Sequence, residues 1–215
     1  MHKNIGKSFI FQGGIIQYRP VLFHYDPLVM LQRNYLVVLG LGSNVGDTKK
    51  NILAAVRKLP VTRKILSPMI KTKALLTKNA PEEWNMDYHN AVVIGRALFG
   101  PFETLNRLKK IEKQMKRIKL GKYSPRTIDI DILFWGKAIL LEKQLRIPHK
   151  EVLNRYFTLK PTVEILPLLR HPICKINMRQ ALLNYNRNTR RSFTSEDHIS
   201  PQSKDTKFSH QLKEY

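Results

Sequence analysis

The sequence contains a single cysteine, Cys174, among 215 residues. One cysteine excludes a disulfide within the chain and any zinc site built from several thiolates. We therefore expect a reducing compartment, the cytoplasm, and interpret Cys174 as a small buried hydrophobe rather than a nucleophile. Long apolar runs are also missing, because nothing reaches the ~18 uninterrupted apolar residues of a membrane helix. No secretory signal peptide and no membrane partner are expected.

Acidic residues are scarce, since 16 Asp and Glu stand against 38 Lys and Arg, for a formal net charge of +22. Such an excess of positive charge favours an anionic partner, which is a nucleic acid, an anionic lipid or a phosphorylated small molecule. A general basic bias that serves only solubility is an alternative for the scattered lysines. The apolar content is ordinary for a globular protein, at 42%.

The chain divides by composition into three parts. Residues 1–33 mix glycine, proline and aromatic residues without a period, and we interpret them as an N-terminal extension. Residues 34–185 carry the apolar patterns of one folded domain. Residues 186–215 are polar and basic, and we expect a disordered tail there, because few apolar side chains are available to offset the entropy of ordering.

Within this domain, the spacing of apolar residues predicts strands and helices in a definite order. Short apolar or alternating runs predict strands over residues 35–41, 64–73, 90–98 and 128–133. Helical spacing predicts two helices, which begin after Asp47 and at Pro101, and Pro60 ends the first. A hairpin near 138–147 and helical turns near 150–166 and 177–185 are expected to follow. The order predicts an α+β fold, a ferredoxin-like βαββαβ core with an antiparallel sheet and an additional C-terminal hairpin and helices.

Two aspartates alternate with isoleucines in the last strand of this core, as Ile128-Asp129-Ile130-Asp131-Ile132. Residues two apart on a strand face the same way, so both carboxylates point to one side and the isoleucines point to the core. Neighbouring carboxylates repel each other unless a cation or a shared proton intervenes, and an all-oxygen site suits magnesium with phosphate ligands. An ordinary solvent-facing strand shows the same alternation, so the pair alone leaves both interpretations open.

The segment before these aspartates is densely basic, because residues 107–126 hold nine Lys or Arg and one acid, Glu112. Lysines on the predicted helix are expected to form a solvated face. Arg117, Lys119 and Arg126 lie at or beyond the helix end, where cations also suit the helix dipole. Because arginine matches the geometry of phosphate oxygens, we favour a polyphosphate held between these cations and magnesium.

Other candidate motifs are weaker. The segment from Gly40 to Gly46 lacks the Gly-Lys-Ser/Thr ending of a P-loop, so a tight strand-to-helix turn is its simpler interpretation. His149 is open to three interpretations: a phosphate ligand, a proton donor or a surface histidine. The other histidines show no metal-ligand spacing, and no Ser-His-Asp or Cys-His arrangement is evident.

Four segments occur together in an order that resembles the 6-hydroxymethyl-7,8-dihydropterin pyrophosphokinase family. They are Leu39 to Asp47 (LGLGSNVGD), Tyr88 to Val93 (YHNAVV), Ser124 to Leu133 (SPRTIDIDIL), and Arg146 to His149 followed by Asn154 to Phe157. The third is similar to the family signature, Pro-Arg-Thr followed by two aspartates. The resemblance covers residues 34–185. It implies transfer of pyrophosphate from ATP to the hydroxymethyl group of the pterin, giving AMP, in folate biosynthesis.

The resemblance also implies a role for each matching residue. Asp129 and Asp131 would hold two magnesium ions on the ATP phosphates, and Arg117 and Arg126 would share in catalysis. The residues that would contact ATP are Leu105, Glu112, Lys119, Arg126, Ile132, His149 and Arg155. The residues that would form the pterin slot are Thr72, Tyr88, Asn90, Tyr123 and Phe157, where aromatic rings stack on the flat heterocycle.

The chain departs from the family pattern at three places. Residues 116–119 read Lys-Arg-Ile-Lys where the family usually has Gly-Arg-x-Arg, so Lys119 lacks a bidentate guanidinium group. Lys150 stands where a tyrosine commonly follows the histidine, and Tyr123 replaces an aromatic residue that is often Trp. These differences bear on substrate affinity and leave both aspartates in place.

Two rival functions use the same features. A nucleic-acid-binding ferredoxin-like domain also explains the net charge, but an RNA-recognition version needs aromatic residues where this chain has Asp129 and Asp131. A metal-dependent phosphodiesterase also uses paired aspartates, but it needs more acidic or histidine ligands than the sequence supplies. We therefore expect ATP and the pterin alcohol as partners, no specific nucleic acid, and a monomer.

Overall fold

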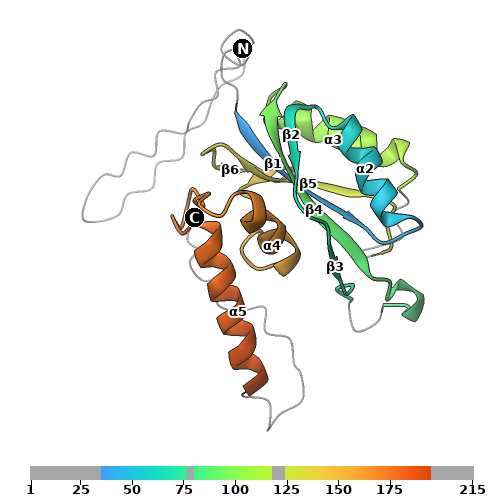
Figure 1. The fold of residues 1–215 in the computed structure, drawn as a ribbon. Helices are drawn as coiled ribbons and strands as arrows, with labels where there is room; N and C mark the ends of the chain where they lie inside the picture. The colour runs from blue at the N-terminus through green and yellow to red at the C-terminus, as the bar shows by residue number, and fades with distance from the viewer. Residues whose placement is uncertain (1–34, 77–79, 118–123, 195–215) are drawn as a thin grey trace.

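The computed structural model describes residues 35–76, 80–117 and 124–194, with side chains as far as residue 189. Figure 1 shows a sheet with helices on both of its faces. The strands are β1 (Leu36–Ser43), β2 (Val61–Leu66), β3 (Ile70–Thr72), β4 (Tyr88–Ala97), β5 (Asp129–Trp135), β6 (Leu140–Leu141) and β7 (Arg146–Ile147). The helices are α2 (Thr48–Lys58), α3 (Pro101–Gln114), α4 (Tyr156–Ile165) and α5 (Met178–Thr194), with a 3-10 turn η1 (Glu82–Trp84).

The large sheet has the strand order β2-β4-β1-β5, and every neighbouring pair is antiparallel. β2 and β3 pair in succession with the same edge of β4. The two-residue strands β6 and β7 pair with each other. The predicted α+β class and antiparallel sheet are therefore confirmed.

Two apolar cores lie on opposite faces of the sheet. One core packs α2 and α3 against the sheet and includes Ile52, Leu108 and Ile130. The other packs α4 and α5 against the opposite face and includes Leu159 and Met178. The fold is thus three layers deep, with the sheet in the middle (Figure 1).

Local sequence signals explain where the first two helices begin and end. The side chain of Asp47 accepts a hydrogen bond from the backbone N–H of Lys50, so it caps α2 as predicted. The helix ends at Lys58, two residues before Pro60. Pro101 occupies the first turn of α3, where its missing N–H leaves no hydrogen bond unmade.

The strand predicted over residues 64–73 is wrong in detail, because the structure has two strands there, β2 and β3. Ser67 and Pro68 separate them. The Ser67 hydroxyl accepts a hydrogen bond from the backbone N–H of Val92 at 2.9 Å, so a side chain replaces part of the backbone ladder. Pro68 has no N–H to donate, which explains why the pairing pauses there.

Two further elements differ from the sequence-based expectation. β1 continues through Ser43, so Gly40 and Gly42 lie in a strand, and the turn begins only after it. β5 continues to Trp135, with both faces buried beyond Ile132, because α4 and α5 cover its second face. α3 ends at Gln114, so Arg117 lies beyond its last residue, as expected.

α5 also extends beyond the predicted domain boundary at residue 185, because it continues to Thr194. Residues 186–194, which were assigned to the tail, are therefore helical, and 195–215 lie outside the described residues, as does the extension 1–33. None of the helices in the described part of the chain has the length and apolar character that crossing a membrane requires.

Candidate active site

A cleft opens over β1, β4 and β5 and reaches the start of α4. In the register of the sheet, Gly42 lies opposite Asn90 on one side and Asp129 on the other. Gly40 lies opposite Asp131. Because neither glycine carries a side chain, the aspartates and Asn90 border a floor that no β1 side chain fills.

The cleft contains about 750 Å³ of empty space, its open mouth included. Its lining comes from the four strands β1, β3, β4 and β5, the segments beside β3, β5 and β7, and the N-cap and first turn of α4. The lining residues are Gly40, Leu41, Gly42, Thr72, Lys73, Leu75, Tyr88, Asn90, Ala91, Arg126, Asp129, Asp131, Leu133, His149, Arg155, Phe157 and Thr158.

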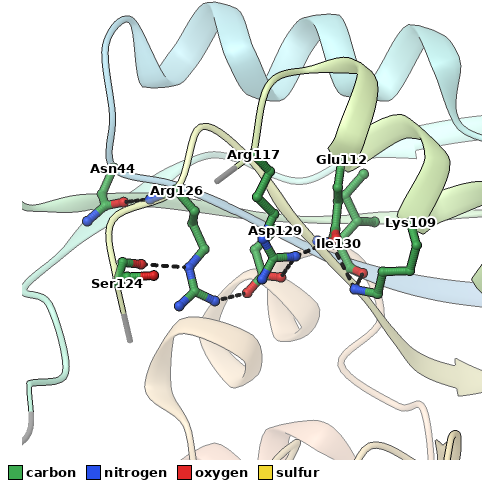
Figure 2. Close-up of polar contacts among 8 residues, drawn as sticks. All are labelled: Asn44, Lys109, Glu112, Arg117, Ser124, Arg126, Asp129 and Ile130. Atoms are coloured by element: carbon green, nitrogen blue, oxygen red, sulfur yellow. Dashed lines mark hydrogen bonds and ion pairs between the residues drawn. The ribbon is translucent and has the colours of Figure 1, made fainter. Parts of the chain in front are cut away.

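Asp129 lies between two arginines, as Figure 2 shows. Its Oδ1 is 2.8 Å from Nη1 of Arg117, and its Oδ2 is 2.7 Å from Nη1 of Arg126. Burial works to raise the pKa of Asp129, but the positive charges of both arginines and of Lys109 outweigh it and hold this pKa below its usual value. Asp129 is therefore ionised at neutral pH.

A second carboxylate, Glu112, holds the other side of Arg117 (Figure 2). The Glu112 side chain is only 4% exposed. Its Oε1 accepts hydrogen bonds from the backbone N–H of Ile130 at 2.8 Å and from Nζ of Lys109 at 2.9 Å, and its Oε2 pairs with Arg117. Charges of alternating sign thus run from α3 to the cleft through Lys109, Glu112, Arg117, Asp129 and Arg126.

Hydrogen bonds hold the segment that carries Arg126 against Asn44, the residue that follows β1. The backbone N–H of Arg126 donates to Oδ1 of Asn44 at 2.8 Å, and the N–H of Asn44 donates to the carbonyl of Arg126 at 3.2 Å. Nε of Arg126 also donates to the carbonyl of Ser124 at 3.1 Å. These bonds orient the guanidinium group toward Asp129 (Figure 2).

The opposite wall of the cleft combines an amide with aromatic rings. Nδ2 of Asn90 donates to Oγ1 of Thr72 at 2.8 Å, which fixes the plane of a side chain that is almost fully buried. Burial raises the pKa of the neighbouring Tyr88 hydroxyl, so it stays protonated at neutral pH. Phe157 lies in the first turn of α4, with the Arg155 guanidinium 5.5 Å from its ring centroid.

His149 lines the cleft, a position that favours a phosphate ligand or a proton donor over a surface histidine without a role. Its backbone N–H donates to the carbonyl of Leu133 at 2.9 Å, and its Nδ1 accepts from the backbone N–H of Glu151 at 3.2 Å. Because Nδ1 accepts, the neutral ring carries its proton on Nε2. Burial lowers the pKa of His149, against the opposing effect of the Asp131 charge, so the neutral ring prevails at physiological pH.

The two carboxylates of the cleft suit a divalent cation that keeps water ligands better than a metal site in which side chains supply every ligand. Asp129 and Asp131 share one face of β5 above Gly40 and Gly42. In the part of the chain that the structure describes, no group of three or more His, Cys, Asp or Glu side chains gathers to hold a metal. Magnesium is commonly bound by one or two carboxylates with water and substrate phosphates as its other ligands, so the pair suits that ion.

Most residues that the sequence singled out line this cleft. From the predicted metal and phosphate set these are Arg126, Asp129, Asp131, His149 and Arg155, and from the predicted pterin slot they are Thr72, Tyr88, Asn90 and Phe157. Arg117 joins them through its ion pair with Asp129. Lys119 and Tyr123 lie outside the described residues.

Three predicted ATP contacts are not brought to the cleft. The side chain of Ile132 is 2% exposed and packs in the core under α2 and α3, because residues of β5 alternate between the two faces. Leu105 packs against the same core from α3. Glu112 lies beneath Asp129 and contacts it only through Arg117.

Sequence reasoning missed several residues of the site. Gly40 and Gly42 were interpreted as a turn, although glycines two apart in an apolar strand are a signal of close approach on one face. Asn44 and Lys73 gave no signal, because their places depend on contacts between segments distant in the sequence. Lys73 lines the cleft and also pairs with Asp87 at 3.0 Å.

Comparisons with known proteins match the part of the chain that forms this cleft. The profile of the 7,8-dihydro-6-hydroxymethylpterin-pyrophosphokinase (HPPK) family matches residues 38–167, which contain all the lining residues. The chain is 36% identical over 146 residues to a 2-amino-4-hydroxy-6-hydroxymethyldihydropteridine pyrophosphokinase of Aquifex aeolicus, covering 67% of the chain and 88% of that relative.

Other relatives are longer. The chain is 37% identical over 139 residues to a folate synthesis bifunctional protein of Chlamydia trachomatis, covering 62% of the chain but 31% of that protein. The fold is similar to that of the wild-type Plasmodium falciparum HPPK-DHPS crystal structure, with a TM-score of 0.58 at 16% identity, over 78% of the chain and 48% of that structure. The chain thus spans about a third of the length of its bifunctional relatives. From the extent of the profile match and the Aquifex relative, the chain belongs to the 7,8-dihydro-6-hydroxymethylpterin-pyrophosphokinase family.

Proposed function

We propose that the protein transfers the diphosphate group of ATP to the hydroxymethyl oxygen of 6-hydroxymethyl-7,8-dihydropterin, giving AMP and the pterin diphosphate for folate biosynthesis. The observation that carries this proposal is the pairing of two chemically different walls in one cleft. Asp129, Asp131 and Arg126 form an ionic wall. Asn90 and Phe157 belong to a wall suited to a flat heterocycle.

In the proposed reaction, the hydroxymethyl oxygen of the pterin attacks the β-phosphorus, forms a new P–O bond and gives up its proton to solvent water. The bond from this phosphorus to the α–β bridging oxygen breaks. AMP leaves with the bond electrons on its phosphate. Positioning and charge neutralisation carry most of such a transfer, so the residues need only align the two substrates and balance charge. Two magnesium ions, bound by Asp129 and Asp131, would neutralise charge on the phosphates.

The ionic residues have separate tasks in this proposal. Arg126, which Asn44 and Ser124 hold in place, presents a guanidinium fork to phosphate oxygens. Arg155 is the residue before α4, lines the cleft and supplies a second phosphate contact. His149 in its neutral form donates from Nε2, and this donor suits a phosphate oxygen. Lys119 stays a prediction for the same group.

The pterin would lie on the other wall. The amide of Asn90 offers a donor and an acceptor to the pyrimidine edge of the heterocycle, and Thr72 fixes which way the amide points. Tyr88 and Phe157 supply aromatic surface against the ring faces, with Tyr123 as a further predicted member. Placing the hydroxymethyl group toward Asp129 and Asp131 sets the reacting oxygen beside the phosphates.

The rival functions have less support. A nucleic-acid-binding domain would present the Asp129 and Asp131 carboxylates to a phosphodiester backbone, which they repel. A two-metal phosphodiesterase needs a larger cluster of ligands, and none occurs among the described residues. The family membership also favours the pyrophosphokinase.

Several finer assignments belong to the same proposal. We take the strand order β2-β4-β1-β5 as support for a ferredoxin-like core. The single cysteine fits a reducing compartment, the cytoplasm, and the protein would act as a monomer on ATP and the pterin alcohol. The folded domain is proposed to begin at residue 34 and to extend past the expected boundary at 185, since α5 continues to Thr194.

The test is a reaction of the full chain with ATP, magnesium and the pterin alcohol, followed by mass spectrometry of the pterin product. The proposal predicts a pterin that carries two phosphates, and no such product when magnesium is removed with EDTA. A pterin that carries one phosphate, or none after complete incubation, would contradict it.

A further inference from the structure

Glu112 lies beneath the cleft. Its contacts are with Arg117, Lys109 and the backbone of Ile130, and none of these residues lines the cleft. A buried carboxylate is costly unless cations and hydrogen bonds satisfy it, and these three contacts supply both to Glu112. They also link Glu112 to Asp129 through one side chain, Arg117.

Arg117 is shared between two carboxylates. Its Nη1 pairs with Oε2 of Glu112 and lies 2.8 Å from Oδ1 of Asp129. The other oxygen of Asp129 is held by Arg126 at 2.7 Å. Both oxygens of Asp129 therefore have a guanidinium partner, and a divalent cation that binds Asp129 competes with one of them (Figure 2).

We propose that Glu112 is a positioning residue, which retains Arg117 when Asp129 turns to a divalent cation and thereby sets the affinity of the Asp129–Asp131 pair for that cation. The proposal rests on the proposed function only in taking this pair as the metal site. Glu112 touches neither substrate in this account. It acts through Arg117, which differs from the nucleotide contact that the family resemblance implied.

The chemistry of the shared arginine gives the direction of the effect. With glutamate at residue 112, Arg117 keeps a carboxylate partner after it leaves Asp129. With an uncharged side chain at residue 112, Asp129 is the remaining carboxylate partner of Arg117, and the cation must compete with a tighter ion pair. Glu112→Gln removes the charge but keeps an oxygen that accepts from the N–H of Ile130.

Binding of Mn²⁺ to the full chain without nucleotide is the direct readout, because Arg117 then has no phosphate to move to. Free Mn²⁺ is measured by electron paramagnetic resonance during titration with MnCl₂. Glu112→Gln is expected to weaken binding by roughly fivefold, in the range of coupling between contacting charged residues. Arg117→Met, which removes the competitor, is expected to tighten it.

The double variant distinguishes this role from a direct electrostatic effect of Glu112 on the ion. If Glu112 acts through Arg117, Glu112→Gln in the Arg117→Met background changes the Kd by less than about twofold. Glu103→Gln is the matched control, because Glu103 is also a glutamate of α3 paired with an arginine, Arg107, at 2.8 Å. Both partners of that pair are exposed, and the control should bind Mn²⁺ like the wild type.

An unchanged Kd in Glu112→Gln, or an equal loss in both backgrounds, overturns the proposal. If Glu112→Gln does not fold, Arg117→Met decides alone, since unchanged or weaker binding contradicts competition by Arg117. Absence of Mn²⁺ binding in the wild type overturns the metal site and this inference together. If Mn²⁺ responds as expected but no pterin diphosphate forms, the proposed function fails and the role of Glu112 stands.

Discussion

Gly42 on β1 lies directly opposite Asn90 on β4, and a Cβ atom at residue 42 would stand 3.0 Å from Oδ1 of Asn90. The same amide is held from its other end by Thr72, through the 2.8 Å bond to Oγ1. Asn90 therefore has little freedom to move away from a larger side chain. The absence of a side chain at residue 42 is a requirement of the proposed pterin wall.

We expect Gly42→Ala to raise the KM for the pterin roughly 10- to 100-fold, because the added methyl group displaces the Asn90 amide from its place. The affinity for ATP should change little. Gly40→Ala is the comparison, since the three atoms nearest to its methyl group would be Cγ and the two Cδ atoms of Leu133, at 3.3 to 3.4 Å. Steady-state kinetics with each substrate varied in turn measures both, and an equal rise in pterin KM for the two variants would contradict the account.

Thr72→Val should loosen the orientation of Asn90 without emptying the space beside it. Valine keeps the shape of threonine but removes the oxygen that accepts from Nδ2 of Asn90, so the buried amide loses a partner. The KM for the pterin should rise about tenfold, equivalent to the loss of one buried hydrogen bond. Thr62→Val on β2, at an exposed position away from the cleft, controls for the effect of the substitution itself. Equal pterin KM values for the two variants would contradict the proposal that Asn90, held by Thr72, binds the pterin.

Part of the site was predictable because it depends on local patterns. The alternation of Ile130, Asp131 and Ile132 correctly predicted which face of β5 is polar. The same pattern could not predict that the second face of β5 is also buried after Ile132. Leu133 and Phe134 are buried under helices that follow much later in the chain, and a period of two describes only one covered face.

The remainder of the site depends on pairing between distant segments. Gly40 and Gly42 matter because β1 lies between β4 and β5, and this order does not follow from the glycines themselves. The place of Glu112 depends on the packing of α3 against β5, which turns a predicted nucleotide contact into a buried partner of Arg117. The length of α5 was underestimated because its polar composition predicted a tail.

The carboxylates themselves are expected to be essential. Asp129→Asn or Asp131→Asn should lower turnover by at least ~10³-fold, because each removes a ligand for the cations that balance phosphate charge. Asp47→Asn is the matched control, since Asn also caps helices and α2 should be preserved. Turnover measured across magnesium concentrations checks this. A near-normal rate with an unchanged magnesium dependence in either cleft variant would refute the assignment.

His171 should make the stability of the fold depend on pH. Burial, with a smaller effect of Lys175, lowers the pKa of His171 to about 4, below its usual value near 6.5. The folded state therefore favours the neutral ring. Its contribution to stability is complete above pH ~6.5 and is lost as the pH falls toward 4, by an amount on the order of 2–3 kcal/mol.

Urea unfolding of the wild type and of His171→Gln at pH 7 and pH 4.5 measures this contribution. From pH 7 to pH 4.5 the unfolding free energy of His171→Gln should fall less than that of the wild type, because the variant lacks the buried imidazole. Other groups with lowered pKa, among them His89 and His149, are present in both proteins and cancel in the difference. If both proteins lose the same unfolding free energy between pH 7 and pH 4.5, protonation of His171 does not destabilise the fold.

The identity of the nucleotide product tests the central claim most directly. The full chain is incubated with ATP, magnesium and the pterin alcohol, and the nucleotides and pterins are separated by chromatography. Attack at the β-phosphorus predicts AMP in one-to-one amount with the pterin diphosphate, no accumulation of ADP, and no AMP without the pterin. ADP formed in proportion to the pterin product would contradict transfer of the diphosphate group, and the absence of both nucleotides would contradict the proposed catalysis altogether.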